Sequence, residues 1–222
     1  IRQFFPSIDH AVLNAVLERK IADEKTLWLC KQILHSGKDI LNEEYDMVYF
    51  SGDNLLSANR LRGLPIGNLT SQFWANVYLN ELDQFIKRKL QTKAYLRYVD
   101  DFLLFAKDKK TLWKWKQAIG QFLETLRLRM HKGSSTVYPT KTGIPFLGFR
   151  LYPTHRRLKR YSGVAFSRRL RTSYRQFSCG ELSRDDLDAR VQGWVAHAKH
   201  GDTWGLRRSV LRAPLPVVNI SA

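Results

Sequence analysis

The sequence contains two β-rich runs, at 94–99 and 102–105, that are separated only by Asp100 and Asp101. Aromatic and branched aliphatic residues favour strands in both runs, and two intervening residues is the spacing of a β-hairpin. A hairpin makes the two strands antiparallel neighbours, which excludes a purely helical fold for this part of the chain. We therefore predict a hairpin with both aspartates at its tip.

Helical periodicity dominates the sequence on both sides of this hairpin. It predicts four helices: one that begins at Ser7, one that covers 23–34, one that ends near Leu90 and one that covers 109–129. Ser7 is expected to cap the first helix, with Asp9 in its first turn. Further short strands are predicted at 47–50, 135–138 and 145–151. A basic helical pattern follows Pro153, so the order of elements indicates an α+β fold with a domain boundary near residue 153.

Positive charge is concentrated in one segment of the chain. Residues 125–180 contain 13 Lys or Arg and no Asp or Glu, and so carry most of the net charge of +17. Such asymmetry favours a bound polyanion, usually nucleic acid, and the alternative is a solvated basic face. The two cysteines exclude a disulfide framework, and no uninterrupted apolar stretch is long enough to span a membrane. An anionic membrane surface is the second possible partner of such a charge. We nevertheless expect a soluble, cytoplasmic protein with no membrane partner.

Asp100 and Asp101 carry the clearest chemical signal. Adjacent carboxylates repel each other unless a cation lies beside them, and hard oxygen ligands suit Mg²⁺ or Mn²⁺. A metal site would need at least one more carboxylate from another element of the fold. The alternative is a polar turn, because aspartate is a favoured turn residue.

The tetrapeptide Tyr98-Val99-Asp100-Asp101 resembles the catalytic motif of reverse transcriptases. Four further segments resemble motifs of bacterial reverse transcriptases, in the order in which that family has them. They are the first palm motif at 4–10, the next palm motif at 63–72 with Ala75 and Asn76, the primer grip at 146–149, and the thumb motif at 193–198 with Thr203 and Leu206. Because these segments span nearly the whole chain, the resemblance favours a metal site over a polar turn at the hairpin.

The resemblance implies a right-hand polymerase fold. Residues 1–152 would form the palm, an antiparallel sheet with helices on one face, and 153–222 would form a small helical thumb. The fingers are absent from this sequence. In the family, the first metal-binding aspartate directly precedes the position of Ile1, so we expect the sequence to be a fragment of a longer enzyme. Asp9 is not expected to replace that ligand, since its position indicates a helix cap.

The implied reaction is attack of a primer 3′-OH on the α-phosphate of a dNTP, directed by a template RNA. Asp100, Asp101 and the preceding aspartate would hold two Mg²⁺ ions, for which Mn²⁺ is a possible substitute. Lys132 matches the lysine proposed in this class to protonate the departing pyrophosphate, and the alternative is an exposed lysine in a basic segment. The other implied site residues are the steric gate Phe5; Ile66, Gly67 and Gln72 near the nascent base pair; Leu147 and Gly148 in the primer grip; and Arg156, Arg157, Lys159, Arg160, Arg168, Arg169 and Arg171 on the backbone of the RNA/cDNA duplex.

The segment from Ile66 to Gln72 resembles one subgroup in particular. Its Ile-Gly-x-x-x-Ser-Gln pattern is similar to the reverse transcriptases of diversity-generating retroelements, whereas most bacterial relatives have Gln-Gly-x-x-x-Ser-Pro. That resemblance implies error-prone copying at template adenines and a small basic accessory protein. Two alternatives stay open: a CRISPR- or phage-defence-associated reverse transcriptase, and a non-catalytic RNA-binding relic.

Overall fold

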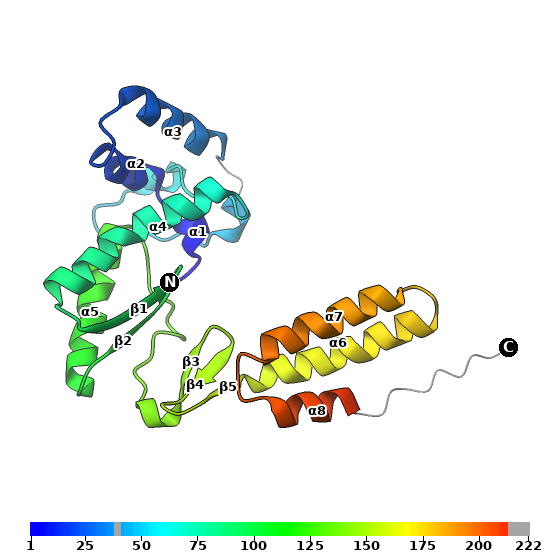
Figure 1. The fold of residues 1–222 in the computed structure, drawn as a ribbon. Helices are drawn as coiled ribbons and strands as arrows, with labels where there is room; N and C mark the ends of the chain where they lie inside the picture. The colour runs from blue at the N-terminus through cyan, green and yellow to red at the C-terminus, as the bar shows by residue number, and fades with distance from the viewer. Residues whose placement is uncertain (38–40, 213–222) are drawn as a thin grey trace. The chain divides into compact units, whose positions relative to one another are not determined.

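The computed structural model describes residues 1–37 and 41–212. The chain divides into two compact units, Ile1–Val137 and Tyr138–Ala222 (Figure 1). Both combine helices with a small antiparallel sheet. In the parts of the chain that the structure describes, no helix is both long enough and apolar enough to cross a membrane.

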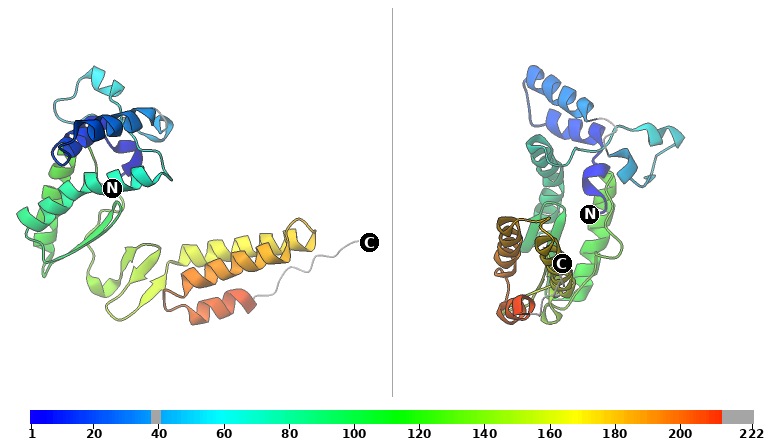
Figure 2. Two further views of the ribbon diagram at one scale, coloured as in Figure 1. Left: turned by 45° about the horizontal axis from the view of Figure 1, so that its top comes forward. Right: turned by 90° about the vertical axis from the view of Figure 1, so that its right-hand side faces the viewer.

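The N-terminal unit is built mainly of helices around one hairpin. Its α-helices are α1 (Phe4–Ser7), α2 (His10–Glu18), α3 (Glu24–Ser36), α4 (Leu69–Gln84) and α5 (Lys109–Thr125). The shorter elements are the 3₁₀-helices η1 (Asn42–Glu44) and η2 (Leu55–Asn59) and the π-helix η3 (Phe85–Lys89), which continues α4. Strands β1 (Ala94–Tyr98) and β2 (Asp101–Phe105) pair antiparallel. In the views of Figures 1 and 2, α4 lies between the α2–α3 pair and the hairpin.

Helix α4 supplies the centre of this unit's core. Tyr78, Leu79 and Leu82 are completely buried and pack with side chains of α2 and α5. The Tyr78 hydroxyl donates a hydrogen bond to the Leu126 carbonyl oxygen at 2.6 Å. Burial raises the pKa of Tyr78, so the hydroxyl stays protonated and keeps this bond, which ties the end of α5 to α4.

The first long helix begins later than the sequence predicts. α2 starts at His10, and the Asp9 carboxylate caps it by accepting from the backbone nitrogens of Ala11 at 2.9 Å and Val12 at 3.1 Å. The prediction that Ser7 caps this helix is wrong, because the Ser7 hydroxyl donates within α1 to the Gln3 carbonyl oxygen. The capping role expected for Asp9 is confirmed, at the N-cap instead of the first turn.

The hairpin forms as predicted, with its turn displaced by one residue. Tyr98 pairs with Asp101, so Val99 and Asp100 are the turn and Asp101 begins β2. Burial alternates along β1, with Tyr95 half-buried against the helical core and Tyr98 exposed. Directly opposed residues of a hairpin share a face, so Asp101 lies on the same open face as Tyr98.

Two predicted strands do not form. Residues 47–50 are irregular and end in a turn, in which the Asp53 carboxylate accepts from the Phe50 nitrogen at 2.9 Å. Residues 135–138 are also irregular, and the Ser135 nitrogen bonds back to the His131 carbonyl oxygen. Local turn hydrogen bonds therefore take the backbone groups that a strand would have paired.

The C-terminal unit is a three-stranded sheet followed by three helices. After the 3₁₀-helix η4 (Thr140–Thr142), strands β3 (Ile144–Phe146), β4 (Phe149–Leu151) and β5 (Arg156–Leu158) pair in sequence order. The helices are α6 (Arg160–Ser178), α7 (Arg184–Ala198) and α8 (Trp204–Arg212). The strand predicted at 145–151 is thus a hairpin of two strands, and β5 was not predicted.

The sheet of this unit packs on its own helices. Phe149 and Leu158 share a core with Phe166 and Trp194, whose rings stack with centroids 4.1 Å apart. For this reason the compact units separate before β3, whereas the change of sequence pattern placed a boundary near residue 153. The division into a palm at 1–152 and a thumb at 153–222 stays a prediction.

Candidate active site

The two aspartates lie at a turn with unusual backbone. Val99 has a φ of 53°, a left-handed conformation that a β-branched side chain rarely adopts. Asp100 follows it, with about a third of its side chain exposed (36%), and Asp101 is exposed at the start of β2. Residues held in such conformations persist only where surrounding contacts enforce them.

Arg97 provides those contacts from within β1. One guanidinium nitrogen donates to the Val99 carbonyl oxygen at 2.9 Å and to the Asn76 side-chain oxygen at 3.1 Å. The rest of the guanidinium grips Asp83 of α4 through two parallel hydrogen bonds of 2.8 and 2.7 Å. The hydroxyl of Tyr95 donates to the same carboxylate at 2.7 Å. Arg97 thus joins the turn before Asp100 to α4.

Charge and burial reinforce this pairing. Burial acts to raise the pKa of the Asp83 carboxyl, but the hydrogen bonds from Arg97 and Tyr95 and the Arg97 charge outweigh it, so this pKa lies below its usual value. The hydrogen bonds to Asp83 raise the pKa of Arg97 in turn. Both side chains therefore remain charged over the neutral range. Sequence reasoning missed this pair, although a half-buried arginine in an otherwise apolar strand is a signal that could have identified it.

The beginning of the chain lies beside Asp100. The Ile1 nitrogen donates to the Asp100 carbonyl oxygen at 3.1 Å and lies 3.9 Å from the Asp100 carboxylate. Asp9 is directed elsewhere: besides its cap, its carboxylate lies 3.4 Å from the guanidinium of Arg127. Arg127 also pairs with the buried carboxylate of Asp53 at 2.7 Å, so Asp9 belongs to an ion network behind the loop at 50–60.

The segment around Phe5 is hydrogen-bonded to the segment that precedes α4. The Leu64 nitrogen donates to the Phe5 carbonyl oxygen at 3.0 Å, and the Gly63 nitrogen to that of Ile8 at 2.8 Å. Phe5 is half-buried, with its ring at 5.4 Å from that of Phe4. These bonds bring two of the predicted nucleotide-binding segments together.

Ile66 and Gly67 lie just before α4, and Gln72 lies within its first turns. Ile66 is 67% exposed, and Gly67 has a φ of 103°, which glycine adopts readily. Gln72 is exposed in the first turns of α4, and its carbonyl oxygen accepts from the Asn76 side chain at 3.1 Å. Since Asn76 also binds Arg97, one chain of hydrogen bonds connects this part of α4 with the hairpin turn.

Lys132 is exposed in the loop after α5. Its turn is shaped by His131, whose ring nitrogen accepts from the backbone of Gly133 and Ser134, both at 3.2 Å. Among the described residues, no hydrogen bond or ion pair joins Lys132 to either aspartate of the hairpin. Its role toward the departing pyrophosphate stays a prediction.

Leu147 and Gly148 form the two-residue turn between β3 and β4. Both have positive φ, 45° and 82°, as in a type I′ turn. Gly148 lies close to His197 of α7, because a Cβ built on this glycine would be 3.8 Å from the imidazole. Leu147 is 42% exposed at the tip, where an apolar side chain can contact a ligand.

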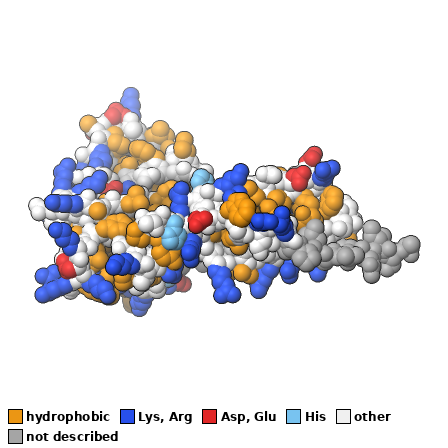
Figure 3. Space-filling model, turned by 60° about the horizontal axis from the view of Figure 1, so that its bottom comes forward, with side chains coloured by type: hydrophobic (Ala, Val, Ile, Leu, Met, Phe, Trp, Pro, Cys, Tyr) orange, Lys and Arg blue, Asp and Glu red, His pale blue; other side chains and the backbone are white. Residues whose placement is uncertain are grey.

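The seven basic residues expected to contact duplex backbone all lie in the C-terminal unit and are exposed. They are Arg156 and Arg157 of β5, Lys159 before α6, and Arg160, Arg168, Arg169 and Arg171 of α6. In the ranges 1–37 and 41–212, none of them forms an ion pair. Several surround an open hollow of about 800 Å³ beside Trp194 and His197. Figure 3 shows Lys and Arg side chains spread along this unit.

Within the described part of the chain, no group of three or more His, Cys, Asp and Glu side chains is placed to hold a metal ion. By itself, the hairpin provides two neighbouring carboxylates, those of Asp100 and Asp101. These are oxygen donors of the kind that Mg²⁺ and Mn²⁺ prefer, and they need a further ligand from outside these residues to complete a site.

Comparison with known proteins gives a consistent result. A family model described as reverse transcriptase (RNA-dependent DNA polymerase) matches residues 1–151. An uncharacterized 91 kDa protein in a cob intron of Schizosaccharomyces pombe is 34% identical over 39% of the chain and 9% of its own length. The group II intron-encoded protein LtrA of Lactococcus lactis subsp. cremoris is 33% identical over 39% of the chain and 12% of its own length. Protein YkfC of Escherichia coli is 24% identical over 68% of the chain and 45% of its own length. The chain thus spans less than half the length of each of these relatives.

Proposed function

The chain belongs to the reverse transcriptase (RNA-dependent DNA polymerase) family, and from this premise we propose that the protein copies a template RNA into cDNA. The observation that carries the proposal is the hairpin tip, where Asp100 and Asp101 lie side by side within the matched residues. In the proposed reaction, a primer 3′-OH attacks the α-phosphate of a dNTP, a new phosphodiester bond forms, and pyrophosphate leaves.

The residues at the tip suit a divalent cation. Both carboxylates offer hard oxygen ligands, and within the described ranges neither carboxylate accepts a hydrogen bond from another side chain. A bound Mg²⁺ or Mn²⁺ supplies positive charge for the reacting phosphate oxygens. We also propose that the third carboxylate is the aspartate that the resemblance places directly before Ile1. The Ile1 nitrogen lies 3.9 Å from the Asp100 carboxylate, so a residue bonded to it would lie beside the same site.

The other proposed roles belong to binding and proton transfer. Phe5 would exclude a ribose 2′-OH, and Lys132 would give a proton to the departing pyrophosphate. Leu147 and Gly148 would hold the primer end. The seven basic residues between Arg156 and Arg171 would contact phosphates of the RNA/cDNA duplex. Such contacts position a duplex without reading its sequence.

Primer extension on an RNA template by the complete protein tests this function. We expect Asp100→Asn to reduce extension at least about a thousandfold, because it removes one charge from the metal-binding pair, while template affinity stays within about twofold. Asp188→Asn, a matched change of an exposed aspartate in α7, should leave extension unchanged. If Asp100→Asn extends like the wild type, the proposed site is wrong; if the wild type binds RNA but never extends, the protein is an RNA-binding relic.

We further propose that the enzyme serves a diversity-generating retroelement, in the cytoplasm, with a small basic accessory protein. Ile66 supports this assignment, since an aliphatic side chain beside the nascent pair lacks the hydrogen bonds with which an amide could hold a template base. Copying an adenine-rich template should give frequent errors at adenines, and Ile66→Gln should lower that error frequency. An unchanged adenine error frequency in Ile66→Gln would remove this explanation of infidelity.

A further inference from the structure

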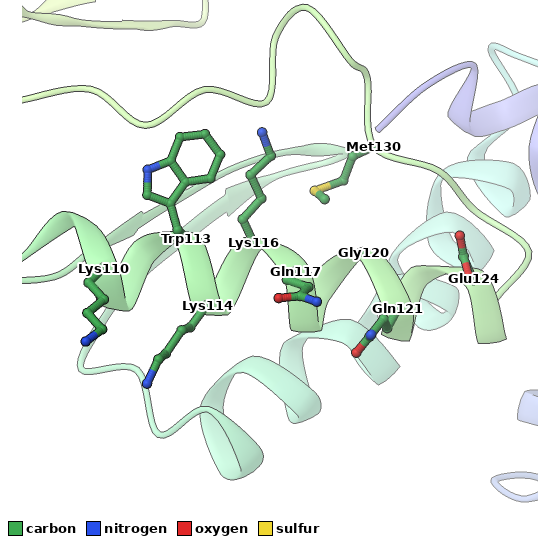
Figure 4. A pocket seen from close by; sticks show the side chains of 9 residues that line it. All are labelled: Lys110, Trp113, Lys114, Lys116, Gln117, Gly120, Gln121, Glu124 and Met130. Carbon is green, nitrogen blue, oxygen red and sulfur yellow. The ribbon is translucent and has the colours of Figure 1, made fainter.

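Helix α5 carries an open groove that the polymerase site does not use. The groove has a volume of about 840 Å³ and is lined by one face of α5, with Lys116 and Met130 at its side (Figure 4). The residues of this face recur at helical spacing: Lys110, Trp113, Lys114, Gln117, Gly120, Gln121 and Glu124. The opposite face of α5 packs into the core through Ile119 and Leu123, so the groove lies on the outer surface of the helix.

Trp113 is the most unusual residue of the groove. Its side chain is 52% exposed, and the Lys116 ammonium lies 4.8 Å from the centre of its ring. Lys116 is itself held by a hydrogen bond to the Ser135 carbonyl oxygen. An aromatic ring that already has a neighbour on one face loses less conformational freedom when a flat group stacks on it.

Two lysines lie across α5 from Trp113. Figure 4 shows Lys110 and Lys114 projecting from one side of α5, and Trp113 and Lys116 from the other, with Gln117 between them. Gly120 lets Met130 approach the helix, since a Cβ at this position would lie 3.2 Å from the Met130 methyl group. The groove therefore offers a ring, the ammonium groups of Lys110 and Lys114, and neutral amides, with Glu124 as the acidic residue of its lining.

We propose that this groove binds an unpaired stretch of the template RNA. A single strand can place a base on Trp113, its phosphates near Lys110 and Lys114, and base edges near the glutamine amides. A duplex cannot use the ring in this way, because its bases are already stacked and paired. The basic lining favours a polyanion over an apolar helix, and the exposed ring of Trp113 favours a strand with unstacked bases over an acidic protein helix. The inference rests on the proposed function, which supplies an RNA strand that extends beyond the copied region.

The complete protein tests this inference in a binding assay that needs no catalysis. Affinity is measured for a labelled RNA/DNA template–primer, once blunt and once with a single-stranded 5′ template overhang of about twenty nucleotides. We expect Trp113→Ala to reduce the gain in affinity from the overhang by about tenfold, and blunt duplex to bind unchanged. Replacing Lys110 and Lys114 by Gln should lower the salt slope of overhang binding by about 1.4, as expected for two phosphates of a single strand.

Matched controls come from α3 and the loop before it. Trp28 is 62% exposed, so Trp28→Ala changes an equally accessible indole, and Lys20→Gln with Lys25→Gln removes two exposed charges. These variants should bind the overhang like the wild type. The inference fails if Trp113→Ala binds the overhang as tightly as Trp28→Ala and the wild type do. Overhang binding by a protein that cannot extend a primer would count against the proposed function alone.

Discussion

At the scale of single residues, the geometry of the hairpin tip depends on Arg97. Val99 holds a left-handed backbone that costs a non-glycine residue about 1–2 kcal/mol. The hydrogen bond from Arg97 to the Val99 carbonyl oxygen, 2.9 Å long, offsets part of that cost and fixes the direction in which Asp100 leaves the turn. Arg97 is therefore a positioning residue for the two carboxylates.

We expect Arg97→Ala to lower kcat for primer extension by about 10- to 100-fold, because misplacing a reacting group by an ångström has effects of this size. The Mg²⁺ concentration for half-maximal activity should rise, while KM for dNTP changes little. Arg97→Lys keeps the charge but loses the two parallel bonds, so its activity should lie between those of the wild type and Arg97→Ala. A titration with Mg²⁺ checks this: lower thermal stability with an unaltered Mg²⁺ requirement would mean that Arg97 only supports the fold.

The Arg97–Asp83 pair makes the stability of the fold depend on pH, because the Asp83 carboxyl can take up a proton. Its pKa is lowered in the folded protein, so the stability that it contributes is complete above the unfolded value of about 3.9 and is lost as pH falls through the folded pKa. Asp83→Asn should unfold at lower urea concentration than the wild type at pH 7, because Arg97 loses its partner. The difference should shrink in the acid range below about pH 4. A difference in urea midpoint that does not change with pH would contradict this assignment.

At the scale of elements, the two hairpins differ in the backbone of their turns. In the turn between β1 and β2, Val99 has positive φ. The turn of β3 and β4 has positive φ at both Leu147 and Gly148, but leucine is a poor residue for the first of these positions. We expect Leu147→Asn to raise the free energy of unfolding of the C-terminal unit by about 0.5–1 kcal/mol, because Asn-Gly suits this turn. If Leu147 contacts the primer end, duplex affinity should fall in the same variant.

Thermal unfolding and duplex binding measured on the same preparation separate the two effects. Gly148→Ala provides the opposite control, since alanine at a φ of 82° is strained and should destabilise the turn. A Leu147→Asn variant that is more stable and binds duplex as tightly as the wild type would exclude Leu147 from the primer grip.

Elements with a strong local signal were predicted well. The helix predicted over 23–34 forms as α3, capped by Asp23, and the helix predicted to end near Leu90 forms as α4 with η3. Predictions failed where short-range hydrogen bonds decide between similar conformations. Ser7 and Asp9 are both good caps, and only the structure shows that Ser7 bonds within α1. No local pattern could reveal β5, because Arg156 and Arg157 carry charge where a strand signal requires apolar residues.

In the candidate site, too, local features could be predicted and tertiary contacts could not. The hairpin and its two aspartates could be predicted from spacing, whereas the turn register and the Arg97–Asp83 pair could not, since that pair joins residues from separate elements. Placement of Phe5 next to the 63–64 segment likewise depends on tertiary hydrogen bonds. Sequence spacing thus identifies groups that lie close together along the chain, and the fold supplies the partners that orient them.

At the scale of the whole molecule, charge is divided between the two units. The acid-free segment 125–180 carries 13 basic residues, and most of them lie in the C-terminal unit. In the N-terminal unit several basic residues are paired instead, as Arg97 is with Asp83 and Arg127 with Asp53. Unpaired exposed charge can release counterions from a bound polyanion, whereas paired charge holds the fold.

This division predicts how duplex affinity responds to salt. Replacing Arg168, Arg169 and Arg171 of α6 by Gln should lower the slope of log affinity against log salt by about 2 to 3, at roughly 0.9 for each phosphate that is no longer neutralised. The matched control removes the same number of charges from the N-terminal unit, at Lys87, Arg88 and Lys89 of η3, which are also exposed. If duplex phosphates lie on α6, the control changes the slope by less than one, because it lowers net charge and leaves the bound phosphates neutralised. Equal slopes for the two triple variants would mean that net charge alone draws the duplex to the protein, and that α6 binds no phosphates of its own.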